Sequence, residues 1–126
     1  MKIKTLLVIN AIIATIFGVA FVFIPGEVYS LYGIEASSQI NFMGQLFGAA
    51  LIGYGLLTWT ARNATISDAL RAIILALFIS DVIGFLVALI AQLNNVVNAL
   101  GWSTVAIYFL LALGFGYFQF KKSVNE

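Results

Sequence analysis

Few side chains in this sequence have the chemistry for acid–base work, and one of them, Asp81, lies inside a long apolar run. The chain of 126 residues contains five Asp and Glu residues and has neither His nor Cys. Without those two residue types, thiol chemistry, haem ligation and ordinary zinc sites are excluded, and the commonest general base is missing. The sequence therefore predicts no catalytic residue, no metal site and no cofactor, and we expect that the protein is not an enzyme.

Asp81 falls near the middle of the apolar run 69–92. A helix there would place it roughly 16 Å deep, close to the midplane of a hydrocarbon layer about 30 Å thick. An acid at that depth costs about 2.5–3.5 kcal/mol on insertion scales, so it should be buried, partnered or functional. One interpretation is a neutral carboxylic acid held by Tyr54 or Asn10, in which case Asp81→Leu would cost about 1–3 kcal/mol by leaving its partner unsatisfied. The other is a proton or cation relay.

The elements that would position these residues are membrane helices. Hydrophobic residues make up 63% of the chain and charged residues 9%, against about 25% charged in soluble domains. The net charge of +1 gives no basic surface for nucleic acid. The sequence predicts an all-α fold, an integral membrane four-helix up-and-down bundle that forms a single transmembrane domain, 1–126. The predicted helices are about 5–24, 41–61, 66–92 and 101–120.

Glycine and alanine recur at helical spacing along these runs. Gly44 and Gly48 have the GxxxG spacing, and Ala49 and Gly53 repeat it on an adjacent face. In lipid, which provides no hydrophobic drive for association, small residues let helices approach closely. We therefore expect 41–61 to be the most buried helix. Two further packing glycines lie on other helices, namely Gly18, in line with Asn10, and Gly84, in line with Asp81.

Two further local patterns give expectations for the third and fourth runs. Thr65 and Asp68 have the spacing of a capping box for the helix 66–92, and Asn98 is a candidate cap for 101–120. The side of 66–92 opposite Asp81 is expected to carry large apolar residues in contact with lipid or core. These are Ile74, Leu77, Phe78, Phe85 and Leu89.

The distribution of basic residues predicts the orientation. All Lys and Arg residues fall at the N-terminus, in the turn between the second and third helices, or at the C-terminus. In a four-span protein these three regions lie on one side of the membrane, and the positive-inside rule makes that side cytoplasmic. Both termini are therefore expected inside, with the protein in a bacterial inner membrane. The residues are Lys2, Lys4, Arg62, Arg71, Lys121 and Lys122.

Two short segments carry a resemblance. Gln45-Leu46-Phe47-Gly48 and Phe78-Ile79-Ser80-Asp81 resemble segments of the four-helix scaffold protein of eukaryotic sterol synthesis, and the whole chain is similar to small four-span bacterial membrane proteins of unknown function. In the sterol scaffold the comparable intramembrane acid is a glutamate, and a further charge beside the Phe-Gly pair is missing here. The resemblance implies a non-enzymatic organiser of membrane partners, with Asp81 and Gln45 as interior polar contacts.

Three classes of function remain after these exclusions. The small-residue faces favour a scaffold or accessory subunit that self-associates or packs against a membrane protein partner within the lipid bilayer. The alternative is an oligomeric channel or transporter with Asp81 as its midplane proton or cation site. An enzyme acting on lipid or quinone would need Asp81 and a tyrosine as its acid and base. No second ionisable group is predicted at the depth of Asp81 to serve as another relay station, which favours the scaffold.

Overall fold

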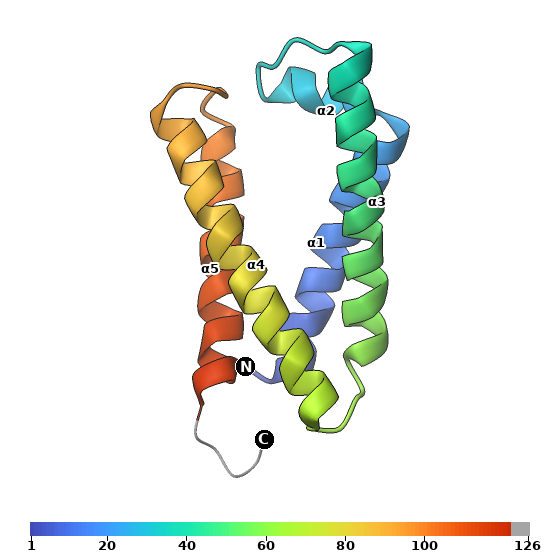
Figure 1. The fold of residues 1–126 in the computed structure, drawn as a ribbon, viewed down its shortest axis with the longest axis vertical. Coiled ribbons are helices and arrows are strands. Elements are labelled where there is room, and N and C mark those ends of the chain that lie inside the picture. The colour runs from blue at the N-terminus through green and yellow to red at the C-terminus, as the bar shows by residue number, and fades with distance from the viewer. Residues whose placement is uncertain (122–126) are drawn as a thin grey trace. The chain divides into compact units, whose positions relative to one another are not determined.

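The structure, a computed structural model, describes residues 1–121 and is all-α, as the sequence predicts. Lys122, one of the six cations that indicate the orientation, lies outside the described residues. Residues 1–121 form five helices and no strand (Figure 1). The helices are α1 (Ile3–Phe23), α2 (Pro25–Leu31), α3 (Ser38–Ala61), α4 (Asp68–Leu93) and α5 (Gly101–Phe120).

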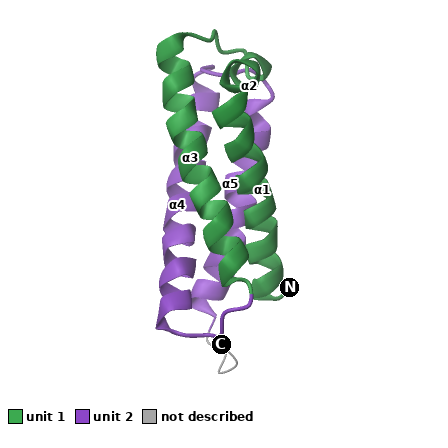
Figure 2. Ribbon diagram, turned by 90° about the vertical axis from the view of Figure 1, so that its right-hand side faces the viewer, with its two compact units in different colours: residues 1–62 green, residues 63–126 purple. Residues whose placement is uncertain are grey.

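The chain divides into two compact units, Met1–Arg62 and Asn63–Glu126, which Figure 2 shows in different colours. In the first unit, α1 and α3 pack along each other, and the short helix α2 contacts both. In the second unit, α4 packs along α5. Each unit is thus a helical hairpin, and the single domain 1–126 stays a prediction.

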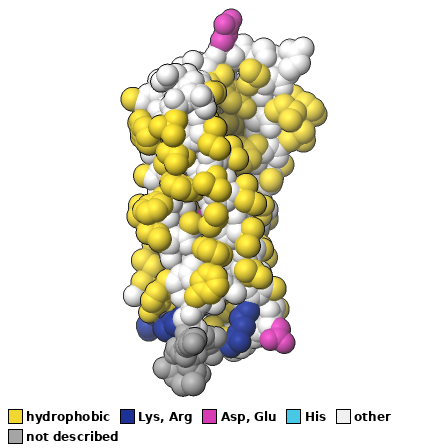
Figure 3. Space-filling model, turned by 60° about the vertical axis from the view of Figure 1, so that its left-hand side comes forward, with side chains coloured by type: hydrophobic (Ala, Val, Ile, Leu, Met, Phe, Trp, Pro, Cys, Tyr) yellow, Lys and Arg dark blue, Asp and Glu magenta, His cyan; other side chains and the backbone are white. Residues whose placement is uncertain are grey.

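Four of the five helices are long and apolar enough to cross a membrane. They contain 21, 24, 26 and 20 residues, and about 20 are needed to span the hydrocarbon layer. The helix α2, with seven residues, is too short. Hydrophobic side chains cover much of the face shown in Figure 3, as expected of surfaces that meet lipid. The protein is therefore a multi-pass integral membrane protein.

The first unit is held by a close approach of backbones between α1 and α3. A Cβ atom added to Gly48 would lie 2.7 Å from the carbonyl oxygen of Gly18, and one added to Gly18 would lie 2.9 Å from that of Gly48. Neither distance is one that a real Cβ atom adopts. Gly18 and Gly48, both predicted as packing glycines, therefore meet each other across the hairpin.

The expectation that 41–61 is the most buried helix is wrong. In the most apolar stretch of α1, 33% of the residues are buried, against 17% in that of α3. Ala49 is exposed, and an added Cβ on Gly53 would meet nothing within 4 Å. The helix α3 directs only its Gly44–Gly48–Gly55 face towards α1 and α2, so the Ala49–Gly53 pair takes no part in the packing of the first unit.

On α4, two predicted features are corrected. Ile74 and Leu77 do not lie opposite Asp81 but are buried with it, because positions three, four and seven apart share one side of a helix. The same spacing places Phe78 and Phe85 on this side, where their rings meet aromatic rings of α5. The N-cap of α4 is Ser67, whose hydroxyl accepts a hydrogen bond of 3.2 Å from the Leu70 amide. Thr65, the predicted cap, lies before the helix, which begins two residues later than expected. Ser37 caps α3 in the same way.

The described cations of the first unit gather at one end of the hairpin. Because α1 and α3 pack along each other and Asn10 contacts Thr58, Lys4 and Arg62 lie within about one helical turn of each other along the hairpin axis. Glu27 and Glu35 belong to the segment between α1 and α3, at the other end. That segment has no Lys or Arg, so the cations of the first unit have the one-sided distribution on which the positive-inside rule depends.

We therefore expect the C-terminus to be cytoplasmic. Fusion of a fluorescent protein that matures only in the cytoplasm after Glu126 should give fluorescent cells, and fusion of alkaline phosphatase at the same place should give no activity. The same reporters inserted after Glu35 should give the reverse result. An active phosphatase after Glu126 would contradict the predicted orientation.

Candidate intramembrane polar site

Asn10, predicted as a partner of Asp81, makes its hydrogen bond inside the first hairpin. Its side chain is buried, and its Nδ2 donates to Thr58 Oγ1 at 3.4 Å. The Thr58 hydroxyl in turn donates to the Tyr54 carbonyl oxygen at 2.8 Å. Thr58 was not predicted, although it continues the Gly44–Gly48–Gly55 face that packs on α1. The pair joins two membrane helices by a direct hydrogen bond between side chains, which is a structural role.

Gln45 also contacts the backbone of the first unit. Its Nε2 donates to the Val22 carbonyl oxygen at 3.1 Å. The carbonyl groups in the last turn of a helix lack intrahelical partners, and Val22 lies in that turn of α1. The Gln45 side chain therefore gives the Val22 carbonyl group, at the end of α1, the hydrogen-bond partner that it would otherwise lack. The side chain is exposed, so the interior contact implied by the resemblance stays a prediction.

Gly44 makes room for a tyrosine from α2. A Cβ atom added to Gly44 would lie 2.6 Å from the Tyr29 hydroxyl oxygen. The Tyr29 ring also meets Phe21 edge-on, with ring centroids 5.7 Å apart, and burial raises the pKa of Tyr29. The predicted packing role of Gly44 thus belongs to the corner formed by α1, α2 and α3.

Asp81 itself is buried, with 6% of its surface exposed, and its Oδ2 has no hydrogen-bond partner among the described residues. Its buried neighbours along the face of α4 are the apolar Leu70, Ile74 and Leu77. Asp81 belongs to the second unit, and Tyr54 and Asn10 to the first, so a single site that contains all three stays a prediction. The Tyr54 side chain is 41% exposed.

The second hairpin has its own glycine contacts. A Cβ atom on Gly84 would overlap the ring of Tyr108, lying 2.8 Å from its Cζ, and one on Gly116 would lie 2.8 Å from the Phe78 ring. Gly84 therefore receives an aromatic ring from α5, whereas Gly18 and Gly48 bring two backbones together. Gly116, on α5, was not among the predicted packing glycines.

A polar corner closes the second hairpin where α4 ends. Gln92 is buried, and its Nε2 donates to the Asn98 carbonyl oxygen at 3.1 Å. Asn98 does not cap α5 as predicted, because the N-cap is Leu100, which makes no side-chain cap bond. Instead Asn98 Oδ1 accepts from the Leu100 amide at 3.1 Å, just before the helix. Gly101 leaves space for the Gln92 carboxamide.

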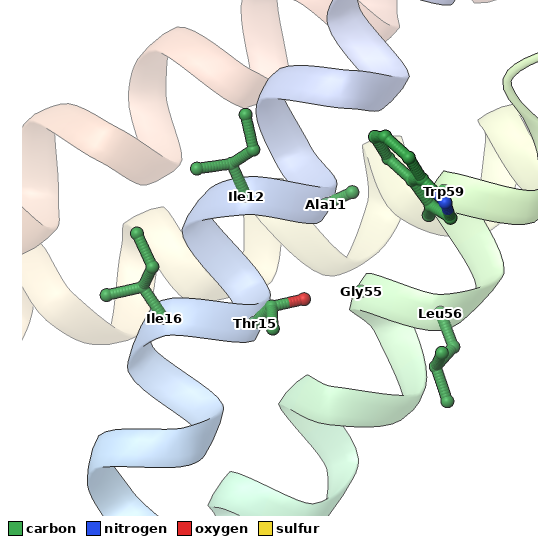
Figure 4. A pocket seen from close by; sticks show the side chains of 7 residues that line it. All are labelled: Ala11, Ile12, Thr15, Ile16, Gly55, Leu56 and Trp59. Carbon is green, nitrogen blue, oxygen red and sulfur yellow. The ribbon is translucent and has the colours of Figure 1, made fainter.

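The first unit also contains an open apolar groove of about 390 Å³ between α1 and α3, here named the α1–α3 groove (Figure 4). At the end of α3, the Arg62 guanidinium lies 3.8 Å above the centre of the Trp59 ring. The sequence places Gly55, Trp59 and Arg62 on one stripe, but does not indicate a hollow. The groove is lined by Ala11, Ile12, Thr15, Ile16, Gly55, Leu56 and Trp59.

Within residues 1–121, no three His, Cys, Asp or Glu side chains come together as a metal site would need. Among the polar side chains described above, Asn10, Gln45 and Gln92 donate hydrogen bonds to a neighbouring side chain, a helix end or a loop, whereas Asp81 Oδ2 has no partner among the described residues. No protein-family model, curated protein or solved structure matches the chain. The resemblance to the sterol-synthesis scaffold therefore stays a prediction.

Proposed function

We propose that the protein is a non-enzymatic scaffold or accessory subunit of a bacterial inner membrane, which self-associates or packs against a membrane protein partner. The observation that carries this proposal is the unoccupied small-residue face of α3. Gly53 has open space where a Cβ would be, and Ala49, one turn away, is exposed. Other predicted packing glycines, such as Gly18 and Gly48, are used inside a hairpin.

A face of small residues on a membrane helix lets another helix come close enough for extensive van der Waals contact. On α3 this face lies on the side away from the packing with α1, because Gly53 is five residues, or about 140° around the helix, from Gly48. Large side chains flank the face, since Leu46 and Leu57 are exposed on either side of it. Such a hollow between larger residues is the shape into which a partner helix packs.

The test compares two substitutions that add the same side chain at exposed positions. Gly53→Leu should fill the face and lower the association constant of the protein with itself, or with its co-purifying partner, by about tenfold. Ala76→Leu, at an exposed position of α4, should leave association unchanged. The measurement is the mass distribution in lipid nanodiscs over a range of protein-to-lipid ratios. A wild-type protein that stays monomeric, with nothing co-purifying, would contradict the proposal.

A second candidate function is an oligomeric channel or transporter that uses Asp81. It is favoured by the buried Oδ2, which has no hydrogen-bond partner among the described residues. An intramembrane acid without a structural partner is the kind of group that binds a proton or cation in transport. Proton or cation flux into vesicles that contain the protein, lost in Asp81→Asn, would favour this candidate over the scaffold.

A further inference from the structure

We infer that the α1–α3 groove and Arg62 together form a binding site for an anionic phospholipid, with an acyl chain in the groove and the phosphate at Arg62. The inference concerns a ligand of the first hairpin and is independent of the scaffold proposal. It follows from three properties of the hairpin, which are the lining of the groove, the chemistry at its end, and the distance between the two.

The lining suits a hydrocarbon chain. Both helices contribute apolar side chains to the rim, and Ile12, Ile16 and Leu56 are all more than half exposed. At Gly55 the two helices touch, because the Thr15 hydroxyl from α1 lies where a Cβ on Gly55 would be, and the apolar side chains beside this contact form the rim of the groove (Figure 4). A volume of about 390 Å³ falls in the range of small-ligand sites, roughly 300–1,000 Å³.

The end of the groove suits a phosphate. The Arg62 guanidinium stacks on Trp59, which also lines the groove, and Arg62 donates one side-chain hydrogen bond to the Trp59 carbonyl oxygen. Within residues 1–121, Arg62 forms no ion pair with a carboxylate. A guanidinium has five N–H donors in a planar fork that matches phosphate oxygens. Stacking on the indole holds that fork in place while other N–H groups stay available.

The spacing between these two parts matches a lipid in a leaflet. Arg62 follows the last residue of α3, so it lies where the span ends and headgroups begin. Gly55 is seven residues further into the span, roughly 10 Å along the helix. A phospholipid with its phosphate at Arg62 would therefore place the upper part of an acyl chain beside Gly55. Tryptophan at that boundary is typical of membrane helices.

The charge selects an anionic lipid. The headgroup of phosphatidylcholine carries its own cation beside the phosphate, whereas phosphatidylglycerol has none. Each basic residue near the membrane surface raises the affinity for an anionic lipid over a zwitterionic one by a factor of about five. A preference of about fivefold for phosphatidylglycerol is therefore the effect expected of Arg62.

The chain has two tryptophans, so the experiment uses bromine on lipid acyl chains, which quenches nearby indole fluorescence. Full-length Trp102→Phe leaves Trp59 as the reporter, and Trp59→Phe leaves Trp102, which lies in the first turn of α5. Each variant is placed in phosphatidylcholine vesicles that contain a minor fraction of either brominated phosphatidylglycerol or brominated phosphatidylcholine. Competition with unbrominated lipid gives the relative affinity at each tryptophan.

We expect Trp59 to prefer phosphatidylglycerol over phosphatidylcholine by about fivefold and Trp102 to show no preference. Arg62→Gln should abolish the preference at Trp59, Arg62→Lys should keep much of it, and the matched control Arg71→Gln should leave it unchanged. Equal quenching of Trp59 by both lipids would overturn the inference. A preference that remains in Arg62→Gln would also overturn it. If Arg71→Gln removes the preference as fully as Arg62→Gln does, the cause is general surface charge, and the inference is overturned as well.

Discussion

Gly48→Leu is expected to destabilise the first hairpin by about 3 kcal/mol, at the upper end of the usual cost of overpacking. Even the first atom of a new side chain has no room, because a Cβ on Gly48 would lie 2.7 Å from the Gly18 carbonyl oxygen and 2.9 Å from Phe21 Cβ. The nearer contact is backbone, which cannot turn away as a flexible side chain can. The two helices must therefore separate, with loss of the packing along their whole contact. Reversible unfolding in mixed micelles measures the free energy of this loss.

Gly53 provides the matched control on the same helix. Gly53→Leu adds the same side chain where nothing lies within 4 Å, so the stability of the isolated chain should change by less than about 0.5 kcal/mol. The smaller pair Gly48→Ala and Gly53→Ala should show the same order, with a loss only for Gly48→Ala. Similar losses at both positions would mean that the contact between Gly18 and Gly48 does not hold the hairpin together.

The long helices could be predicted from the sequence because a membrane leaves the chain little choice. Backbone groups in lipid must be satisfied within the segment, so an apolar run of about 20 residues becomes a helix. Pro25 follows the end of α1 at Phe23 and begins α2, as a residue that suits the first turn of a helix but not its interior. The helix bounds depend on such local signals.

The packing partners could not be predicted in the same way. Gly44, Gly48 and Gly53 look alike in sequence, but they meet a tyrosine ring, a glycine carbonyl and open space, respectively. Which of these a glycine meets depends on the crossing of two helices, which local spacing does not determine. The error about Ile74 and Leu77 is different, because helical spacing alone places both on the side of Asp81.

The polar residues show the same limit. The sequence identifies Asn10 as an interior polar group, but its partner Thr58 is 48 residues away and was not identified. The resemblance implies an interior contact for Gln45 but does not identify its partner, and the structure shows a hydrogen bond to the carbonyl group of Val22 at the end of α1. A buried amide must find a partner, and many arrangements of two helices provide one. The need for a partner can be predicted, but its identity requires the fold.

Asp81→Leu is expected to leave the free energy of unfolding unchanged or to raise it by about 1–3 kcal/mol. The sequence alone predicts a loss of that size, on the assumption that Asp81 has a hydrogen-bond partner. Its Oδ2 instead is buried without one among the described residues, so the substitution removes an unsatisfied polar atom. Leucine is also of suitable size beside the buried Leu77 on the same face. Reversible unfolding in mixed micelles measures whether the free energy of unfolding rises or falls in Asp81→Leu.

Asn10→Leu is the matched control, because it replaces a buried polar side chain that does have a partner. It should lower stability by about 0.6–1.7 kcal/mol, the size measured for hydrogen bonds between membrane helices, since Asn10 donates to Thr58. If Asp81→Leu raises the free energy of unfolding while Asn10→Leu lowers it, Asp81 lowers the stability of the isolated chain. An acid that does so serves something beyond the fold of one chain, either a partner that completes its hydrogen bonds or a proton or cation. A clear loss of stability in Asp81→Leu would instead indicate a structural partner within the chain and remove the ground for the channel candidate.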